Sequence, residues 1–311
     1  MILITGGLGL IGSNLISRLN SEGISEIINV DSHTSEKAEN VRDLNFLEFF
    51  DKHYFREQIR NDSFDFIPSA VIHMGACSDT TEQDFNYLMD NNFRYSQELL
   101  NWCLKKKINF IYASSASVYG VSNNFQESKE NESPINFYAE SKLKFDNYVR
   151  ELSNISSQVT GLRFFNVFGP NESHKGRMAS TVFHFYNQIK DSGEAKLFKG
   201  TNGISNGEQL RDFIYVKDCV SIILWFLQNK KSGIFNVGTG HANNFNSVAQ
   251  NIIEKLGFGK IKYIDFPKDL LGSYQNFTQA NLLEIKKIGL NHNFLSLKES
   301  IFDYIEHLEK P

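Results

Sequence analysis

Tyr138 and Lys142 could move a proton together, because they lie four residues apart in the segment YAESK. Residues at positions i and i+4 face the same side of a helix. A tyrosine with its ordinary pKa near 10 is a poor base at neutral pH, but a nearby ammonium group favours the phenolate. The pair therefore predicts an acid–base centre whose tyrosine has a lowered pKa.

The context of this pair matters, because Tyr186 and Lys190 repeat its spacing. Upstream of Tyr138, the segment YASSASVYG ends an expected parallel strand and offers Ser115 as a hydrogen-bond donor to a substrate oxygen. Tyr138 opens the following helix, so the strand end and the helix start can meet over a ligand. No such strand precedes Tyr186, for which we expect an ordinary amphipathic helix.

A glycine-rich turn, TGGLGLIG, follows the first expected strand and places Gly6, Gly9 and Gly12 at three-residue spacing. Glycine suits a tight turn in which the backbone approaches a pyrophosphate and the helix packs closely on the strand. Asp31 ends the next expected strand, where a carboxylate can accept from the ribose 2′-hydroxyl of NAD. Lys37 could instead pair with the 2′-phosphate of NADP or lie solvated in its loop, so both dinucleotides stay open.

Short apolar strands alternate with longer amphipathic stretches over the first half of the chain: 1–5, a helix over 11–20, 27–31, 70–73, a helix from about 86 to 104, 109–114, a helix from about 137, and 158–165. This order predicts an α/β fold with a Rossmann-type, doubly wound parallel sheet. After Asn166 the loops lengthen, and the pieces KLFKG, DFIYV and GIFNVG are separated by irregular segments. This change of pattern indicates a smaller, discontinuous α/β lobe that binds substrate.

The expected domain boundaries follow from that change of pattern. The dinucleotide-binding domain comprises 1–165, about 213–237 and 275–291, and the substrate-binding lobe comprises about 166–212, 238–274 and 292–311.

Composition excludes several classes of function. The formal charge of −4 and the pI near 6.1 disfavour nucleic-acid binding, which needs a basic face. Cys77, Cys103 and Cys219 lack the spacing of a disulfide framework or a metal site. No apolar run approaches the length that spans a bilayer, and the start MILITGG lacks the features of a signal peptide. We therefore expect a cytoplasmic protein without a metal or a membrane partner.

Together, the glycine-rich turn, Ser115, Tyr138 and Lys142 resemble the extended short-chain dehydrogenase/reductase family that acts on nucleotide-sugars. Within it, the chain is most similar to the ADP-L-glycero-D-manno-heptose 6-epimerases. The motifs that carry this resemblance span nearly the whole chain: GACSDTTE, MDNN, YASSASVYG, YAESK, FFNVFGPNESHKGRMAS, RDFIYVKD and YQNFTQA. The HKG-x-MAS loop is the most specific of them.

The resemblance implies an isomerase with tightly bound NADP, which epimerises C6 of ADP-D-glycero-D-manno-heptose through a transient ketone. It places the enzyme in the synthesis of the lipopolysaccharide inner core of a Gram-negative bacterium. One base cannot easily serve both C6 epimers, and the family's second acid/base is the lysine of the HKG loop, here Lys175. Ser115 would bind the reacting oxygen, and Lys142 would hold the nicotinamide ribose. Heptose epimerases associate, commonly as pentamers, so a homo-oligomer is implied too.

Residue by residue, the resemblance also implies two binding sets. The cofactor set is Gly6, Gly9, Leu10, Ile11, Gly12, Asp31, Ser32, Lys37, Lys52, Met74, Gly75, Ala76, Cys77, Ser78, Asn91, Lys142, Val167 and Lys175. The substrate set is Ser115, Asn166, Arg177, His184, Phe198, Lys199, Gly200, Thr201, Arg211 and Tyr274. Arg211 could instead form a structural link with Asp212, and His184 could be a core histidine.

Other functions remain possible for this sequence. A 4,6-dehydratase would carry an acidic pair where this chain has Ala116 and Ser117, so dehydration is disfavoured. A UDP- or GDP-hexose epimerase needs only the Ser/Tyr/Lys set, and a cofactor-binding regulator needs no catalytic set at all. Arg177, where relatives carry a smaller residue, and the long segment before Arg211 depart from the heptose epimerase pattern on the substrate side.

Overall fold

Seven parallel strands form the central sheet of the computed structural model, which describes residues 1–201, 203–267 and 275–310. Their order is β11-β6-β5-β4-β1-β2-β3. The bounds are β1 (Ile2–Thr5), β2 (Ile27–Asp31), β3 (Glu48–Asp51), β4 (Ala70–His73), β5 (Asn109–Ser115), β6 (Val159–Phe164) and β11 (Gly233–Val237). The chain reverses its direction of progress between β1 and β4, which is where doubly wound sheets bind ligands.

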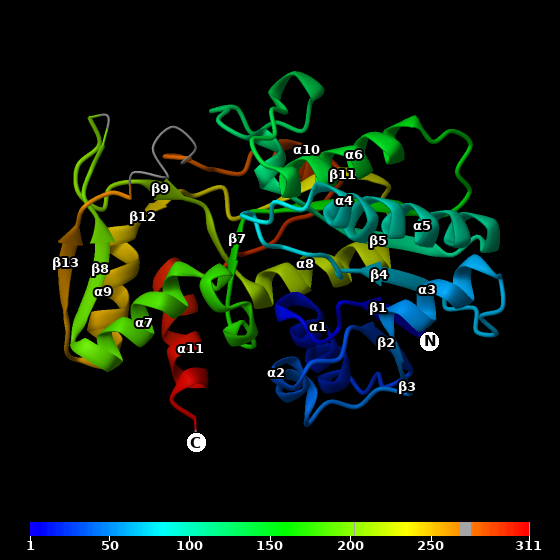
Figure 1. The fold of residues 1–311 in the computed structure, drawn as a ribbon, viewed down its shortest axis with the longest axis horizontal. Helices are drawn as coiled ribbons and strands as arrows, with labels where there is room; N and C mark the ends of the chain where they lie inside the picture. The colour runs from blue at the N-terminus through cyan, green and yellow to red at the C-terminus, as the bar shows by residue number, and fades with distance from the viewer. Residues whose placement is uncertain (202, 268–274, 311) are drawn as a thin grey trace.

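Helices cover both faces of this sheet (Figure 1). One face packs against α1 (Leu10–Ser21), α8 (Val216–Asn229) and α10 (Leu283–Lys287). The other packs against α3 (Lys52–Arg60), α5 (Tyr95–Lys106) and α6 (Phe137–Glu151). The inner strands are apolar at nearly every position because both of their faces are buried.

A smaller lobe lies beside the carboxyl end of the sheet, at the left of Figure 1. Its strands β8 (Glu194–Phe198) and β13 (Lys260–Ile264) pair in parallel. They share an apolar core with α7 (Thr181–Ser192), α9 (Phe245–Leu256) and α11 (Leu297–Leu308). Two short pairs connect the lobe to the sheet: β7 (Asn166–Phe168) with β10 (Phe213–Tyr215), and β9 (Leu210–Arg211) with β12 (Asn243–Asn244).

The remaining helical turns are short. They are α2 (Ser35–Ala38), η1 (Glu39–Val41), α4 (Phe85–Leu88), η2 (Met89–Arg94), η3 (Ala116–Tyr119), η4 (Lys129–Asn131) and η5 (Ser173–Met178). Across the described ranges, no helix has the length and apolarity needed to cross a membrane.

The expected fold class is confirmed, with two differences in its elements. The helix predicted from about residue 86 consists of α4, a π-helical turn η2 and α5. Strand β3 and helix α3 were not predicted, because the EFFD strand lies at the sheet edge, is only partly buried and has no continuous apolar run. The exact boundaries between the two domains stay a prediction.

Candidate active site

A first cavity opens at the carboxyl ends of the central strands and contains residues from both parts of the chain. Its lining comes from the β1–α1 turn, from the ends of β2, β4, β5 and β6, from α6 and from the segment around η5. The lining residues are Gly6, Gly9, Leu10, Ile11, Gly12, Asp31, Lys37, Met74, Gly75, Ala76, Ser78, Ala113, Ser114, Ser115, Tyr138, Lys142, Phe164, Phe165, Val167, His174 and Lys175.

The glycine-rich turn fits a dinucleotide. Gly6 has a φ of 71°, a value that favours glycine, and a Cβ on Gly12 would lie 2.1 Å from the Gly6 carbonyl oxygen. Gly9 begins α1 without a side-chain cap, so the N–H groups of the first turn stay available. A helix N-terminus with free N–H groups is suited to an anion such as a pyrophosphate.

A second cavity adjoins the first and contains the remaining predicted cofactor residues, Ser32, Lys52, Cys77 and Asn91. All members of the predicted cofactor set therefore line these two cavities. Asp31 accepts from the N–H groups of Leu8 and Ser32, and Lys37 Nζ donates to its Oδ1 at 3.2 Å. Lys37 thus pairs with Asp31 rather than lying solvated in its loop.

Ser115 and Tyr138 meet across the end of β5 and the start of α6. Ser115 Oγ accepts from the N–H and the hydroxyl of Ser117, at 3.2 and 2.9 Å, and also interacts with the Tyr138 hydroxyl. Burial raises the pKa of Tyr138, and the Ser115 contact only partly offsets this effect. The prediction that Lys142 lowers the pKa of Tyr138 is therefore wrong.

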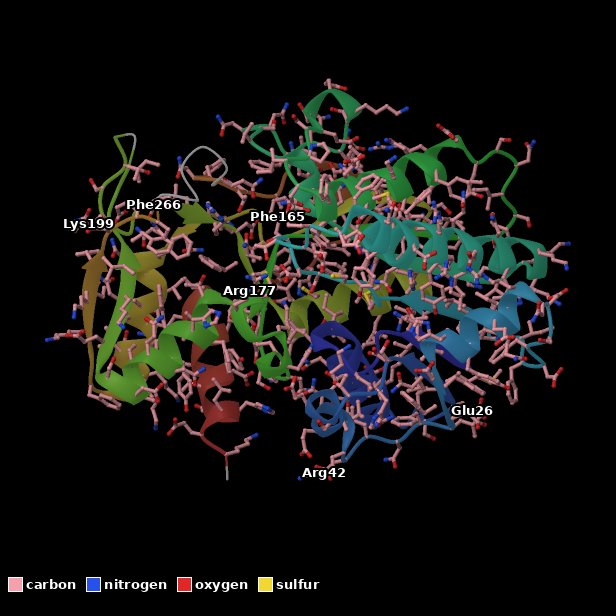
Figure 2. The ribbon with its side chains drawn as sticks, viewed as in Figure 1. Glu26, Arg42, Phe165, Arg177, Lys199 and Phe266 are labelled. Atoms are coloured by element: carbon pink, nitrogen blue, oxygen red, sulfur yellow. The ribbon has the colours of Figure 1, made fainter. Side chains whose placement is uncertain are left out.

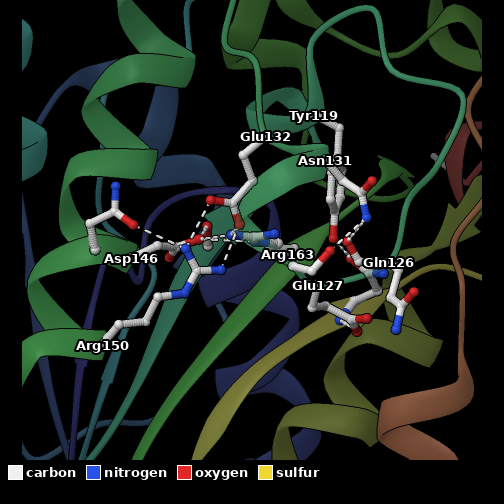
Figure 3. A network of polar contacts seen from close by, with 12 residues as sticks. Tyr119, Gln126, Glu127, Asn131, Glu132, Asp146, Arg150 and Arg163 are labelled. Carbon is white, nitrogen blue, oxygen red and sulfur yellow. Dashed lines mark hydrogen bonds and ion pairs between the residues drawn. The ribbon is translucent and has the colours of Figure 1, made fainter.

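The reason lies in the position of the Lys142 ammonium, which donates to the Ala113 carbonyl at 2.8 Å. Burial lowers the pKa of Lys142 to about 8, against the attraction of the Asp146 carboxylate. Asp146 lies one turn further along α6 and belongs to a buried ion network (Figure 3). Arg163 of β6 pairs there with both Asp146 and Glu132, and Glu132 also binds Arg150.

Lys175 lies on η5, half-buried, and lines the same cavity as Tyr138. Burial lowers its pKa from the usual 10.5, and the charge of Glu172 opposes that shift. The next residue, Gly176, has a φ of 51°, which turns the backbone sharply directly after the lysine. A partly buried amine with a lowered pKa is suited to proton transfer near neutral pH.

A third cavity, of about 610 Å³, adjoins the first at Ser78, which lines both. Five predicted substrate residues line it: Asn166, Arg177, His184, Phe198 and Arg211. His184 is half-buried beside the Arg177 carbonyl, so it is not a core histidine. Figure 2 shows Arg177 between the two lobes, where it pairs with Asp79.

Other predicted substrate residues lie elsewhere. Lys199 does not line the third cavity. It pairs with Asp265 at the far edge of the smaller lobe (Figure 2). Neither Lys199 nor its neighbours Gly200 and Thr201 line the described cavities, because the chain turns outward after β8. Tyr274 lies outside the described residues. Tyr186 and Lys190 lie on α7 and both bind Glu309, as an ordinary helix pair would.

Sequence reasoning missed several lining residues. Ala113, Ser114, Phe164 and Phe165 lie at strand ends, so the rule that ligands bind there could have identified them. The third cavity also contains residues from α7, from the loop before β9, from β10 and from α9: Gln188, Gln209, Phe213 and Phe245. Phe213 belongs to the RDFIYVKD motif, whereas none of the quoted motifs contains the other three.

The comparisons with known proteins agree with this geometry. The sequence profile of the NAD dependent epimerase/dehydratase family matches residues 2–238. A protein of Alkalilimnicola ehrlichii, named ADP-L-glycero-D-manno-heptose-6-epimerase, is 47% identical over 309 residues, covering 98% of this chain and 97% of that protein.

Two solved structures extend the comparison. An ADP-L-glycero-D-manno-heptose-6-epimerase of Helicobacter pylori has a TM-score of 0.84 at 30% identity, covering 99% of this chain and 95% of its own. A UDP-N-acetylglucosamine 4-epimerase of Methanobrevibacter ruminantium has a TM-score of 0.86 at 23% identity, covering 99% and 97%, and shows the fold alone. The resemblance inferred from the motifs is confirmed. The chain belongs to the NAD-dependent epimerase/dehydratase family.

Proposed function

We propose that this protein epimerises C6 of ADP-D-glycero-D-manno-heptose to give ADP-L-glycero-D-manno-heptose, through a transient 6-ketone and in the synthesis of lipopolysaccharide inner-core heptose. One observation carries the proposal: Tyr138 and Lys175 line one cavity, which adjoins a larger cavity on the substrate side. The relative of Alkalilimnicola ehrlichii that bears this activity as its name supports the choice of substrate.

When bound, the dinucleotide supplies hydride transfer at C6, with no net redox change. The hydroxyl of each epimer projects to a different side of C6, so each needs its own proton acceptor. Tyr138, beside Ser115, serves one epimer, and Lys175 serves the other. Ser115 donates to the reacting oxygen, which stabilises the charge that develops there.

NADP is the proposed cofactor, and NAD is the alternative. The Asp31 carboxylate is already bound to two N–H groups and to the ammonium of Lys37. Lys52 brings a second ammonium to the same cavity, where it donates to Asn91 at 2.8 Å. Two cations around one engaged carboxylate favour an anion such as the 2′-phosphate. Fluorescence titration of cofactor-free protein with NADPH and NADH tests this preference directly.

The third cavity supports binding of a nucleoside diphosphate. Arg177 and Arg211 provide cations for the diphosphate, while Phe198, Phe213 and Phe245 provide apolar surface for a base. Arg211 also lies over the Phe245 ring, at 5.8 Å from its centroid. A homo-oligomer is part of the proposal on the strength of the family resemblance, and light scattering after size exclusion measures it.

Incubation of the purified protein with ADP-D-glycero-D-manno-heptose, without added nicotinamide, tests the activity. We expect the two C6 epimers to approach an equilibrium mixture, as followed by chromatography or NMR. If a folded, cofactor-loaded protein converts none of it, the heptose assignment is wrong. UDP- and GDP-hexoses are then the next substrates to assay, with Arg177 as the first residue to examine.

A further inference from the structure

The segment from Gly169 to Ser180 contains one buried acid, Glu172, which the proposed chemistry does not use. Glu172 is fully buried, with an exposed fraction of 0%. Its carboxylate accepts from the N–H of Gly169 at 3.3 Å, and from the N–H and the hydroxyl of Ser180 at 2.5 and 2.8 Å. One carboxylate therefore binds both ends of this segment.

Lys175 lies inside the segment that these contacts close. Its own backbone N–H donates to the Glu172 carbonyl at 3.0 Å, so the main chain of Glu172 fixes the lysine as well. Among the described residues, the Lys175 side chain has no hydrogen-bond partner, and Glu172 is the acid whose charge acts on its amine. Glu172 thus fixes the main chain at Lys175, and its charge opposes the effect of burial on the amine.

The same carboxylate reaches the substrate side through Ser180. The Ser180 hydroxyl also accepts from the N–H of Phe183 and so caps the N-terminus of α7. His184, on the first turns of that helix, lines the substrate cavity. Glu172 thus ties the segment that carries Lys175 to the helix that lines the neighbouring cavity.

We propose that Glu172 is a positioning residue for Lys175, because its carboxylate closes the segment Gly169–Ser180 that carries the lysine. This proposal rests on the proposed function, in which Lys175 exchanges a proton with one epimer. Glu172 itself touches neither the first nor the third cavity. It acts through the lysine.

Other charged or titratable groups surround the pair. Tyr304 of α11 faces Glu172, and burial together with the Glu172 charge raises the pKa of that hydroxyl. His174, next to Lys175, has a pKa lowered to about 4 by burial and by Lys37 and Lys175, so its ring is neutral at pH 7. Asp31 acts on His174 from β2 in the opposite direction. Glu172 remains the acid that acts on Lys175 itself.

Competitive acetylation of the cofactor-loaded protein, read by mass spectrometry across a pH series, reports the titration of Lys175 without needing its substrate. In Glu172→Gln the midpoint for Lys175 should fall, because the carboxylate charge that opposes the effect of burial is gone. Glu172→Asp keeps the charge and should keep the midpoint. Glu254→Gln, at an exposed pair with Lys298, is the matched control and should change nothing.

An unchanged midpoint in Glu172→Gln would overturn the proposal, even if that variant were less stable. Should Glu172→Gln fail to fold, Ser180→Ala gives the second test. That variant removes one donor and leaves the charge, so Lys175 should be acetylated faster with the same midpoint, and an unchanged rate would overturn the proposal. Since acetylation uses no sugar, failure of this proposal is distinguishable from failure of the heptose assignment.

Discussion

Tyr138 and Lys175 line one cavity, but the molecule holds them in different ways. Tyr138 lies in the first turn of α6, a 15-residue helix that Asn136 caps at its start. Beneath that helix, a buried ion network joins Asp146 to Arg163 of the central sheet. Lys175 lies on a short turn that a single carboxylate closes. Regular elements and the core place the first residue, whereas a few local contacts place the second.

Removal of the Tyr138 hydroxyl should have the greatest effect on activity. Tyr138→Phe should lower the epimerisation rate by roughly 10²–10⁴-fold, the usual contribution of a positioned acid/base. The variant should still fold and retain its dinucleotide, because the ring and the turn around Gly6 remain. Tyr186→Phe is the matched control, since Tyr186 and Lys190 share the spacing but lie on α7. Equal losses in both variants would remove the distinction between the two pairs.

The buried ion network beneath α6 can be broken at Arg163. Arg163→Met should cost about 3–5 kcal/mol in the free energy of unfolding, because it leaves the buried Asp146 carboxylate without its cation, while Glu132 keeps only Arg150. The control is Lys298→Met, which breaks an exposed pair with Glu254 and should cost at most about 1 kcal/mol. Urea denaturation measures both. A small loss in Arg163→Met would show that the network does not support α6.

Substitutions in the glycine-rich turn should have effects of intermediate size on stability and on cofactor binding. A Cβ on Gly12 would meet the Gly6 carbonyl oxygen at 2.1 Å, so Gly12→Ala should destabilise the fold by about 1–3 kcal/mol. A Cβ on Gly9 would lie 3.3 Å from the same oxygen and meets less backbone. Gly9→Ala should therefore leave the melting temperature near that of the wild type but weaken NADPH binding. Calorimetry and fluorescence titration separate the two outcomes.

The smallest effect is expected at Arg177, which forms an exposed pair with Asp79 at 3.1 Å. Arg177→Ser should cost less than about 1 kcal/mol of stability. Because Arg177 lines the substrate cavity, the same change should raise KM more than it lowers kcat. Asp79→Asn breaks the pair without removing the cation and is the control. A change in kcat alone would place Arg177 in the chemistry rather than in binding.

The same contrast explains what the sequence could predict. Strands around Gly6, Asp31 and Ser115 have buried apolar runs that end at recognisable turns, so the sheet and its ligand-bearing edge followed from local pattern. The edge strand β3 could not be predicted from local pattern, because it is short and partly exposed.

On the substrate side, local pattern was less informative. Arg177, His184 and Arg211 line the third cavity as the family resemblance implied, whereas Lys199 to Thr201 turn away from it after β8. The role of Glu172 depends on contacts with Gly169 and Ser180 that no spacing rule predicts. The pKa of Tyr138 was mispredicted because burial outweighs a lysine that donates to Ala113 instead.

Lys175→Met provides the most direct test of the two-base account. Its interconversion of the two ADP-heptose epimers, followed from either epimer by NMR, should be at least about 100-fold slower than that of the wild type. Cofactor content, melting temperature and the helical signal in circular dichroism should stay unchanged. If Lys175→Met interconverts the epimers at the wild-type rate, a single acid/base suffices and Lys175 is not the second acid/base.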